Sequence, residues 1–363
     1  MSTTLISVSE PVADPVLVFR EGAVGRIRLN RPKALNSLTL EMVRAIASAL
    51  DSFENEPAIS CVLLDGEGSR GLCAGGDIRA IYDSGQRQDG EAERFWREEY
   101  ILNERIARFP KPYIAVMDGI TMGGGIGVAA HGSYRIVTER SRIAMPEVGI
   151  GFVPDVGGTW LLSRAPGELG TYLALTGETV SGGDAIRVGL ADIMVPSERI
   201  LAMTDALSSL GPGAAPDDIQ GILQWHSRQA NDETLWQHRE IIDRCFVHDN
   251  IESIAATLGD ATEEFAQKAV ATLLKKSPTS LKVALRLLRL ARQSTLEDCL
   301  RREYRAAVRC LRGNDFYEGV RAAIIDKDRN PRWQPEDIRA VSNTIVGQYF
   351  ALLHSNEPVF PPR

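Results

Sequence analysis

The chain has 363 residues, 44% of them hydrophobic and 25% charged, and a formal net charge of −7 at pH 7. This length and composition are those of a globular protein with a large core, arranged as one large domain or two. The negative charge argues against a general nucleic-acid binder, because phosphate binding depends on clustered lysine and arginine. The five cysteines form no C-x-x-C pair and the five histidines no H-x-x-x-H pair, so we expect reduced thiols and no metal site.

The first residues give no sign of targeting to a membrane or an organelle. Residues 1–15 contain Glu10 and Asp14 but no lysine or arginine, unlike a secretory signal or an arginine-rich transit peptide. No apolar run in the chain approaches the length of a membrane span. We therefore expect a polar leader and a cytoplasmic protein without membrane contact.

Strand–turn–helix units recur over the first 212 residues. Residues 16–30 hold two alternating runs around Gly22, which predict a strand pair. Thr39 is a predicted N-cap because a stripe of apolar residues with helical spacing follows it. Residues 61–65 and 113–117 predict buried strands, each followed by a glycine-rich turn and a helix-like segment. Such repeats predict a largely parallel sheet with helices outside it.

The pattern changes to amphipathic helix after the Gly-, Pro- and Ala-rich segment 211–216. Helices are predicted at 251–258, 263–275, 280–292 and 296–312. We therefore expect an α/β core over 16–212, a helical C-terminal region over 213–340, and a tail of unknown role over 341–363. The lysines and arginines between 275 and 292 have helical spacing, which fits a solvated face or a contact with the phosphates of a nucleotide-bearing substrate.

Two glycine-rich turns each follow a predicted strand. They contain Gly75-Gly76 and Gly123-Gly124-Gly125, whose bare N–H groups could converge on one developing negative charge, such as that on a thioester carbonyl oxygen. The first turn alone is more typical of an ordinary tight turn. Three glycines in sequence are entropically unfavourable, so they indicate close approach of a ligand or another backbone.

Other glycine-rich motifs fit less well. A dinucleotide-binding G-x-G-x-x-G would need a third glycine where Val128 stands. The chain also lacks the Gly-Lys-Ser/Thr ending of a phosphate-binding P-loop and the G-x-S-x-G of a nucleophile elbow. Nucleotide-binding and serine-hydrolase functions are therefore disfavoured.

Two carboxylates, Glu147 and Asp155, stand eight residues apart in an otherwise apolar and glycine-rich segment. A carboxyl group in apolar surroundings has a raised pKa, which suits general acid or base catalysis. The structural alternatives are an N-cap or a partner of Arg142 for Glu147, and an N-cap of a helix over 159–164 for Asp155. Together with the two glycine turns, the pair favours catalysis.

Several segments of the chain carry a resemblance to a known family. The segments that carry it are Leu29–Ser37, Cys73–Asp77, Glu98–Asn103, Gly119–Gly125, Met145–Glu147, Phe152–Gly158, Ser277–Lys282 and Asp315–Asp328. With them the chain resembles the crotonase (enoyl-CoA hydratase/isomerase) superfamily from about residue 16 to 335, and within it the branch whose members hydrolyse short 3-hydroxyacyl-CoA thioesters.

The resemblance implies a fold, a substrate and a site. The implied fold is an α/β spiral of ββα units with a helical C-terminal region. The implied reaction is hydrolysis of a short 3-hydroxyacyl-CoA thioester, with 3-hydroxyisobutyryl-CoA as the expected substrate and valine catabolism as the setting. It assigns the oxyanion hole to the N–H groups of Gly76 and Gly124, the central catalytic carboxylate to Glu147, its partner near the 3-hydroxyl to Asp155, and a substrate-pocket role to Glu99. It implies a homo-oligomer, a trimer or hexamer, and no metal or redox cofactor.

One departure from the wider superfamily bears on the activity. Enoyl-CoA hydratases have a second catalytic glutamate, and dienoyl-CoA isomerases an acid, at the position that Gly127 occupies here. Hydrolysis is therefore expected ahead of hydration. An isomerase that uses Glu147 alone, and a non-catalytic binding or assembly component with this fold, are the alternatives.

Overall fold

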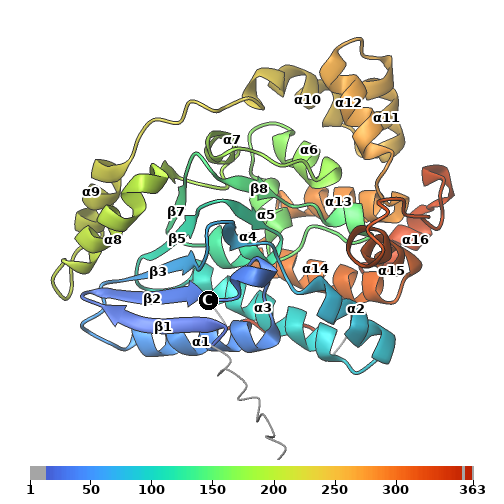
Figure 1. The fold of residues 1–363 in the computed structure, drawn as a ribbon. Helices are drawn as coiled ribbons and strands as arrows, with labels where there is room; N and C mark the ends of the chain where they lie inside the picture. The colour runs from blue at the N-terminus through green and yellow to red at the C-terminus, as the bar shows by residue number, and fades with distance from the viewer. Residues whose placement is uncertain (1–13, 354–355, 362–363) are drawn as a thin grey trace, which may run out of the picture.

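The computed structural model describes residues 14–353 and 356–361 (Figure 1). The expected polar leader falls almost entirely on residues 1–13, outside the described residues. Within the described ranges, no helix is both long and apolar enough to cross a membrane.

A six-stranded sheet forms the centre of the first half of the chain. Its strand order is β1 (Val16–Glu21), β2 (Val24–Leu29), β3 (Cys61–Gly66), β5 (Tyr113–Met117), β7 (Tyr134–Val137) and β9 (Ile193–Met194). The β1–β2 pair is antiparallel and the other pairings are parallel, which confirms the predicted strand pair and both predicted buried strands. β3 and β5 are buried almost throughout because helices cover both faces of the sheet, as in other parallel sheets.

A second, smaller parallel sheet carries the glycine turns. It contains β4 (Gly71–Cys73), β6 (Ile120–Met122) and β8 (Arg142–Ala144). In each of the pairs β3–β4, β5–β6 and β7–β8, the first strand belongs to the large sheet and the second to the small sheet. Helix α2 (Ile78–Arg87) follows the first of these pairs, and α4 (Gly124–Ala129) follows the second. This is the expected spiral of ββα units. Both glycine turns lie at the carboxyl ends of neighbouring strands, β4 and β6, so the topology brings them together.

Helices on the two faces of the large sheet form separate cores. α8 (Ile200–Ser208) and α9 (Pro216–His226) pack on one face, against residues such as Leu63 and Ile114. α1 (Leu40–Glu54) and α3 (Glu91–Ala107) belong to the larger core on the other side. The predicted N-cap of α1 is confirmed, since the Thr39 side chain accepts a hydrogen bond from the Met42 N–H. The boundary expected at residue 212 lies in the loop between α8 and α9, which pack on the same face.

The remaining helices build the C-terminal half and its contacts with the core. They are α5 (Gly158–Leu162), α6 (Leu169–Thr176), α7 (Gly182–Arg187), α10 (Arg239–Phe246), α11 (Ile251–Asp260), α12 (Glu264–Leu273), α13 (Pro278–Ala291), α14 (Leu296–Leu311), α15 (Asn314–Val320) and α16 (Asn343–Gln348). All four helices predicted after residue 250 are confirmed. In the described part of the chain no strand follows β9. The segment after residue 341 packs back on this half, where Glu357 pairs with Arg305 at 2.6 Å.

Ion pairs within the protein use much of the basic stretch that begins at residue 275. Lys282 contacts Glu252 at 2.6 Å, and Arg289 and Arg292 both contact the buried carboxylate of Glu168. These three cations therefore hold helices together, which weakens the alternative that they meet substrate phosphates.

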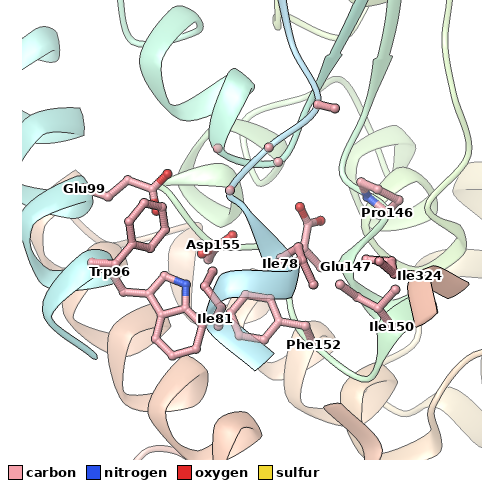
Figure 2. A pocket seen from close by; sticks show the side chains of 16 residues that line it. Ile78, Ile81, Trp96, Glu99, Pro146, Glu147, Ile150, Phe152, Asp155 and Ile324 are labelled. Atoms are coloured by element: carbon pink, nitrogen blue, oxygen red, sulfur yellow. The ribbon is translucent and has the colours of Figure 1, made fainter. Parts of the chain in front are cut away.

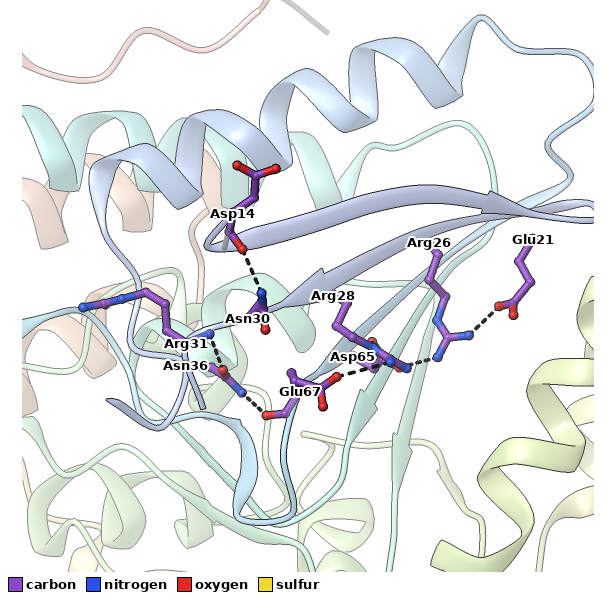
Figure 3. A network of polar contacts seen from close by, with 9 residues as sticks. All are labelled: Asp14, Glu21, Arg26, Arg28, Asn30, Arg31, Asn36, Asp65 and Glu67. Atoms are coloured by element: carbon purple, nitrogen blue, oxygen red, sulfur yellow. Dashed lines mark hydrogen bonds and ion pairs between the residues drawn. The ribbon is translucent and has the colours of Figure 1, made fainter. Parts of the chain in front are cut away.

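A polar network fixes the loop that supports the first glycine turn (Figure 3). Asn36 is buried in a left-handed conformation with φ of 53°. Its Oδ1 accepts from the N–H of Arg31 at 2.9 Å, and its Nδ2 donates to the carbonyl of Glu67 at 3.0 Å. Just beyond it, the Leu38 N–H donates to the Gly75 carbonyl at 2.8 Å. The loop thereby holds the glycine turn from one side.

We predict that Asn36→Ala lowers the free energy of unfolding by about 1–3 kcal/mol, because it removes the hydrogen bonds of the Asn36 side chain to two part-buried backbone groups and to the buried Gly71 carbonyl. Chemical denaturation of both proteins measures the difference. Asn55→Ala is the matched control: this asparagine is exposed and its side chain donates to the Asp51 carbonyl within the same helix end, so its effect should stay within about 0.5 kcal/mol. Equal losses in the two variants would contradict the role given to the Asn36 network.

Candidate active site

All five residues predicted for the site line one cavity of about 200 Å³. Figure 2 shows Glu99 and Trp96 on one side of it and Glu147, Ile150 and Ile324 on the other, with Asp155 between them. Apolar side chains form most of the remaining wall, and none of the described residues that line it is a lysine, arginine or histidine. The cavity is therefore apolar with three converging carboxyl groups.

The two glycine turns meet at this cavity. Leu38 donates to the Gly75 carbonyl and accepts from the Asp77 N–H, both at 2.8 Å, so the N–H of the intervening Gly76 points away from Leu38. Gly124 is the first residue of α4, and a helix leaves its first N–H groups without intrahelical partners. A Cβ placed on Gly124 would lie 3.2 Å from the Gly76 nitrogen. The two backbones thus approach more closely than side chains would allow.

Glu147 begins the 3-10 turn Glu147–Ile150 and is 6% exposed. Its Oε2 is buried and has no hydrogen-bond partner among the described residues. Burial raises the pKa of Glu147 well above its ordinary value, and the nearby charge of Asp155 adds to the rise. The structural alternatives are wrong: the N-cap of this turn is Pro146, and the Arg142 guanidinium donates instead to the carbonyl of Ser141. A buried carboxyl group with one oxygen left without a partner is available for chemistry.

Asp155 is also buried, and its Oδ2 accepts a 2.6 Å hydrogen bond from the Tyr100 hydroxyl. Burial raises the pKa of Asp155 to about 7, although the bond from Tyr100 opposes the rise. The N-cap alternative is wrong, because α5 begins at Gly158 with Gly157 as its N-cap and no side chain caps it.

Glu99 lies beside the second glycine turn rather than on the surface. A Cβ on Gly124 would lie 2.6 Å from Glu99 Oε1, which has no hydrogen-bond partner among the described residues. Burial raises the pKa of Glu99 well above its ordinary value, and the charges of Asp155 and Glu147 raise it further. Its neighbour Glu98 is the surface residue of the pair and contacts Arg44 at 2.7 Å.

The position that holds a second acid in related hydratases is closed here. A Cβ on Gly127 would lie 2.7 Å from Val156 Cβ and 2.8 Å from Asn103 Nδ2. Both neighbours are buried. A larger side chain at residue 127 would therefore collide with the wall of the site instead of entering it.

Tyr100, Ile324 and Glu303 also shape the site, and none of them was expected from the sequence. Tyr100 could have been found, since Trp96, Glu99, Tyr100 and Asn103 share one face of α3, where a glutamate and an asparagine among apolar residues are unusual. Ile324 and Glu303 come from the C-terminal half. No local pattern indicates that either residue reaches the site.

Comparison with known proteins agrees with this fold. Residues 24–350 match the model of a family described as enoyl-CoA hydratase/isomerase. A rat protein named mitochondrial 3-hydroxyisobutyryl-CoA hydrolase is 42% identical over 350 residues, which is 95% of this chain and 91% of the rat protein. The human protein of the same name is 40% identical over 353 residues, covering 96% of this chain and 91% of its own length.

Solved structures with the same fold carry other descriptions. One described as a carnitinyl-CoA dehydratase from Mycobacterium thermoresistibile has a TM-score of 0.91 and 45% identity, covering 96% of this chain and 100% of that chain. One described as an enoyl-CoA hydratase from Rhodobacter sphaeroides has a TM-score of 0.88 and 41% identity, with the same coverage. The similarity therefore extends over nearly the whole length, including the helical half.

We predict that Gly127→Glu destabilises the protein, by about 1–3 kcal/mol from overpacking alone, and creates no hydration of crotonyl-CoA. The reason is the contact of its Cβ with Val156 and Asn103. Thermal unfolding and a hydration assay measure the two effects. Gly221→Glu serves as control, because Gly221 is exposed on α9 with nothing within 4 Å of an added Cβ. A stable Gly127→Glu variant with hydratase activity would show that the position is open.

Proposed function

The chain belongs to the enoyl-CoA hydratase/isomerase family, and we propose that it is an acyl-CoA thioester hydrolase that cleaves 3-hydroxyisobutyryl-CoA. Water supplies a hydroxyl group to the acyl carbon, the carbon–sulfur bond breaks, and the products are 3-hydroxyisobutyrate and CoA. The relatives with 40–42% identity support this substrate. The observation that carries the proposal is the Glu147–Asp155 pair beside two glycine turns, in a cavity where the position of residue 127 is closed.

The size of the cavity supports a short acyl group. Its volume is about 200 Å³ and most of its wall is apolar. Trp96 and Phe152, whose rings stack at 5.3 Å, form a rigid part of the wall. A small branched acyl chain fits such an apolar space.

The glycine turns provide the electrostatic part of the reaction. With the thioester carbonyl between Gly76 and Gly124, their N–H groups donate to the oxygen as it becomes negative. Removing one such donor typically costs about 2.7–4 kcal/mol of barrier stabilisation. Glu147 then acts on the carbonyl carbon in one of two ways. It attacks directly and forms an anhydride, or it takes a proton from the attacking water. Either route uses the buried Glu147 carboxylate, whose Oε2 has no hydrogen-bond partner among the described residues.

The other two carboxyl groups suit the 3-hydroxyl of the substrate. One oxygen of Asp155, Oδ2, accepts a hydrogen bond from the Tyr100 hydroxyl. Its other oxygen accepts a hydrogen bond from the 3-hydroxyl of the substrate. Glu99 is buried and its pKa is raised well above the ordinary value, so in its neutral form it donates a hydrogen bond to the hydroxyl oxygen. A hydroxyl group donates one hydrogen bond and accepts another. The 3-hydroxyl therefore donates to the Asp155 carboxylate and accepts from the neutral carboxyl group of Glu99.

Hydration or dehydration is the second candidate, because the solved structures with 41–45% identity are described by those activities. The closed position at Gly127 favours hydrolysis over hydration, since a hydratase uses two acids to handle its water. Binding without catalysis is less favoured, because it gives no reason to bury Glu147 unpaired at an energetic cost. The proposed chemistry needs no metal or redox cofactor. The cytoplasmic location and the homo-oligomer expected from the sequence stay predictions; the hydrolase relatives named above are called mitochondrial.

Thiol release from a panel of acyl-CoAs tests the proposal directly. We expect cleavage of 3-hydroxyisobutyryl-CoA and 3-hydroxypropionyl-CoA, slower cleavage of acetyl-CoA, and little hydration of crotonyl-CoA. The physical reason is the paired contact with a 3-hydroxyl and the absence of a second hydratase acid. Hydration of crotonyl-CoA faster than cleavage of 3-hydroxyisobutyryl-CoA would reverse the assignment.

Two substitutions separate the roles of the carboxylates. Glu147→Gln should lower kcat severely for every thioester with KM nearly unchanged, as for a group used in the transition state. Asp155→Ala should lower hydrolysis of 3-hydroxyisobutyryl-CoA much more than that of isobutyryl-CoA, because only the first has a hydroxyl for Asp155 to bind. Steady-state kinetics on both substrates measure the difference. Equal losses would place Asp155 in the general machinery, and no loss would make it a structural residue.

A further inference from the structure

We infer that Glu303, on helix α14 of the C-terminal half, is a positioning residue that holds the catalytic turn from Asp155 to Thr159 in its active form. The inference rests on the proposed hydrolase function for its kinetic consequences. Its geometric content is independent of the substrate.

Glu303 is bound to the turn through both carboxylate oxygens. The N–H of Gly157 donates to Oε2 at 2.7 Å, and the N–H of Thr159 donates to Oε1 at 3.0 Å. The Thr159 hydroxyl also donates to Oε1. Glu303 is fully buried. Three donors converge on this carboxylate, which is the arrangement that stabilises its charged form.

The turn needs such support because its backbone is strained. Val156 has a φ of 53°, which a β-branched residue rarely adopts, and Gly157 follows with a φ of 76°. Strained conformations persist only when surrounding contacts enforce them. His131 Nε2 lies 2.8 Å from the Val156 carbonyl, and Tyr100 holds Asp155 itself. Glu303 contributes three of the hydrogen bonds that fix this turn.

The charge of Glu303 also acts on the catalytic carboxyls. It raises the pKa of Asp155 and of Glu147, because like charges in a buried region disfavour ionisation. Burial raises the pKa of Glu303 itself to about 7, and the three hydrogen bonds oppose that rise. The titratable and charged groups around it are Asp155 and Glu147 from the site, Tyr100 and Glu99 from α3, His131, and Cys299 and Arg302 from α14.

The loss of the Glu303 charge shifts the pH dependence of the activity in one direction. Hydrolysis needs ionised carboxyl groups, so activity falls as pH drops through their pKa values. Without the negative charge at residue 303, the pKa of Asp155 and of Glu147 falls. The acidic limb of the pH–rate profile then moves to lower pH. A residue that only stabilises the fold would not move this limb.

Glu303→Gln is the test, because glutamine keeps the size of the side chain but offers one acceptor oxygen to donors that now use two. On 3-hydroxyisobutyryl-CoA we expect kcat to fall about tenfold or more with little change in KM, together with the shift of the acidic limb to lower pH. A crystal structure should show residue 156 out of the left-handed region, with the Tyr100–Asp155 bond kept. An unmoved limb, or a turn that keeps its wild-type form, would overturn the inference.

The matched control is Glu168→Gln. Glu168 is likewise buried and accepts bonds from Arg289 and Arg292, but it does not line the active-site cavity. This variant should lower the melting temperature without moving the acidic limb. A limb that moves equally in the control would overturn the inference.

Failure of the proposed function and failure of Glu303→Gln to fold can each be told apart from failure of this inference. If the wild-type protein hydrolyses no acyl-CoA, the proposed function fails, and the crystal structure of Glu303→Gln still decides the geometric claim. If Glu303→Gln does not fold, Thr159→Val replaces it, since this nearly isosteric change removes one of the three donors. Thr159→Val should lower kcat severalfold with KM unchanged. A kcat equal to that of the wild type would overturn the inference.

Discussion

Carboxyl groups concentrated around one buried cavity, with no cation among its described lining residues, are the constraint on which the rest of this site depends. Glu99, Glu147 and Asp155 line the cavity and Glu303 lies behind it, while none of the described lining residues is basic. Such groups cannot all ionise together, because each charge raises the pKa of the next. Differences in hydrogen bonding therefore decide which of them stay neutral. The same repulsion favours release of a product that has just become a carboxylate.

The C-terminal helices complete this environment rather than forming a separate unit beside it. Ile324 lines the cavity and Glu303 holds the turn of Asp155. The close contact between the halves depends on glycines, since a Cβ on Gly151 would lie 2.1 Å from the Asp315 carbonyl oxygen. The environment of Asp155 therefore depends on both halves, so separating them would expose the carboxyls and remove the shifts in pKa on which the chemistry rests.

Local patterns predicted the elements well and the long-range contacts poorly. The apolar spacing after Thr39 and the compact run at 113–117 gave the correct helix and strand, because both signals lie within one element. Four of the five expected site residues share one cavity because they follow the neighbouring strands β4, β6 and β8, and Glu99 reaches the same cavity from α3. Glu303 could not be predicted in this way. It lies 146 residues from Gly157 in the chain, and its own helix looks like an ordinary amphipathic segment.

The missing hydratase acid and the strained turn are parts of one arrangement. The left-handed backbone at Val156 brings its side chain against Gly127, so the conformation that presents Asp155 also closes the place of a second acid. Strain of this kind is of order 1–3 kcal/mol, less than three charge-assisted hydrogen bonds to a buried carboxylate can provide. The hydrogen bonds to Glu303 therefore offset the strain of the turn in the folded protein. A glutamate at residue 127 would need a different turn, so the two activities are separated by a coordinated change in backbone, packing and charge rather than by one substitution.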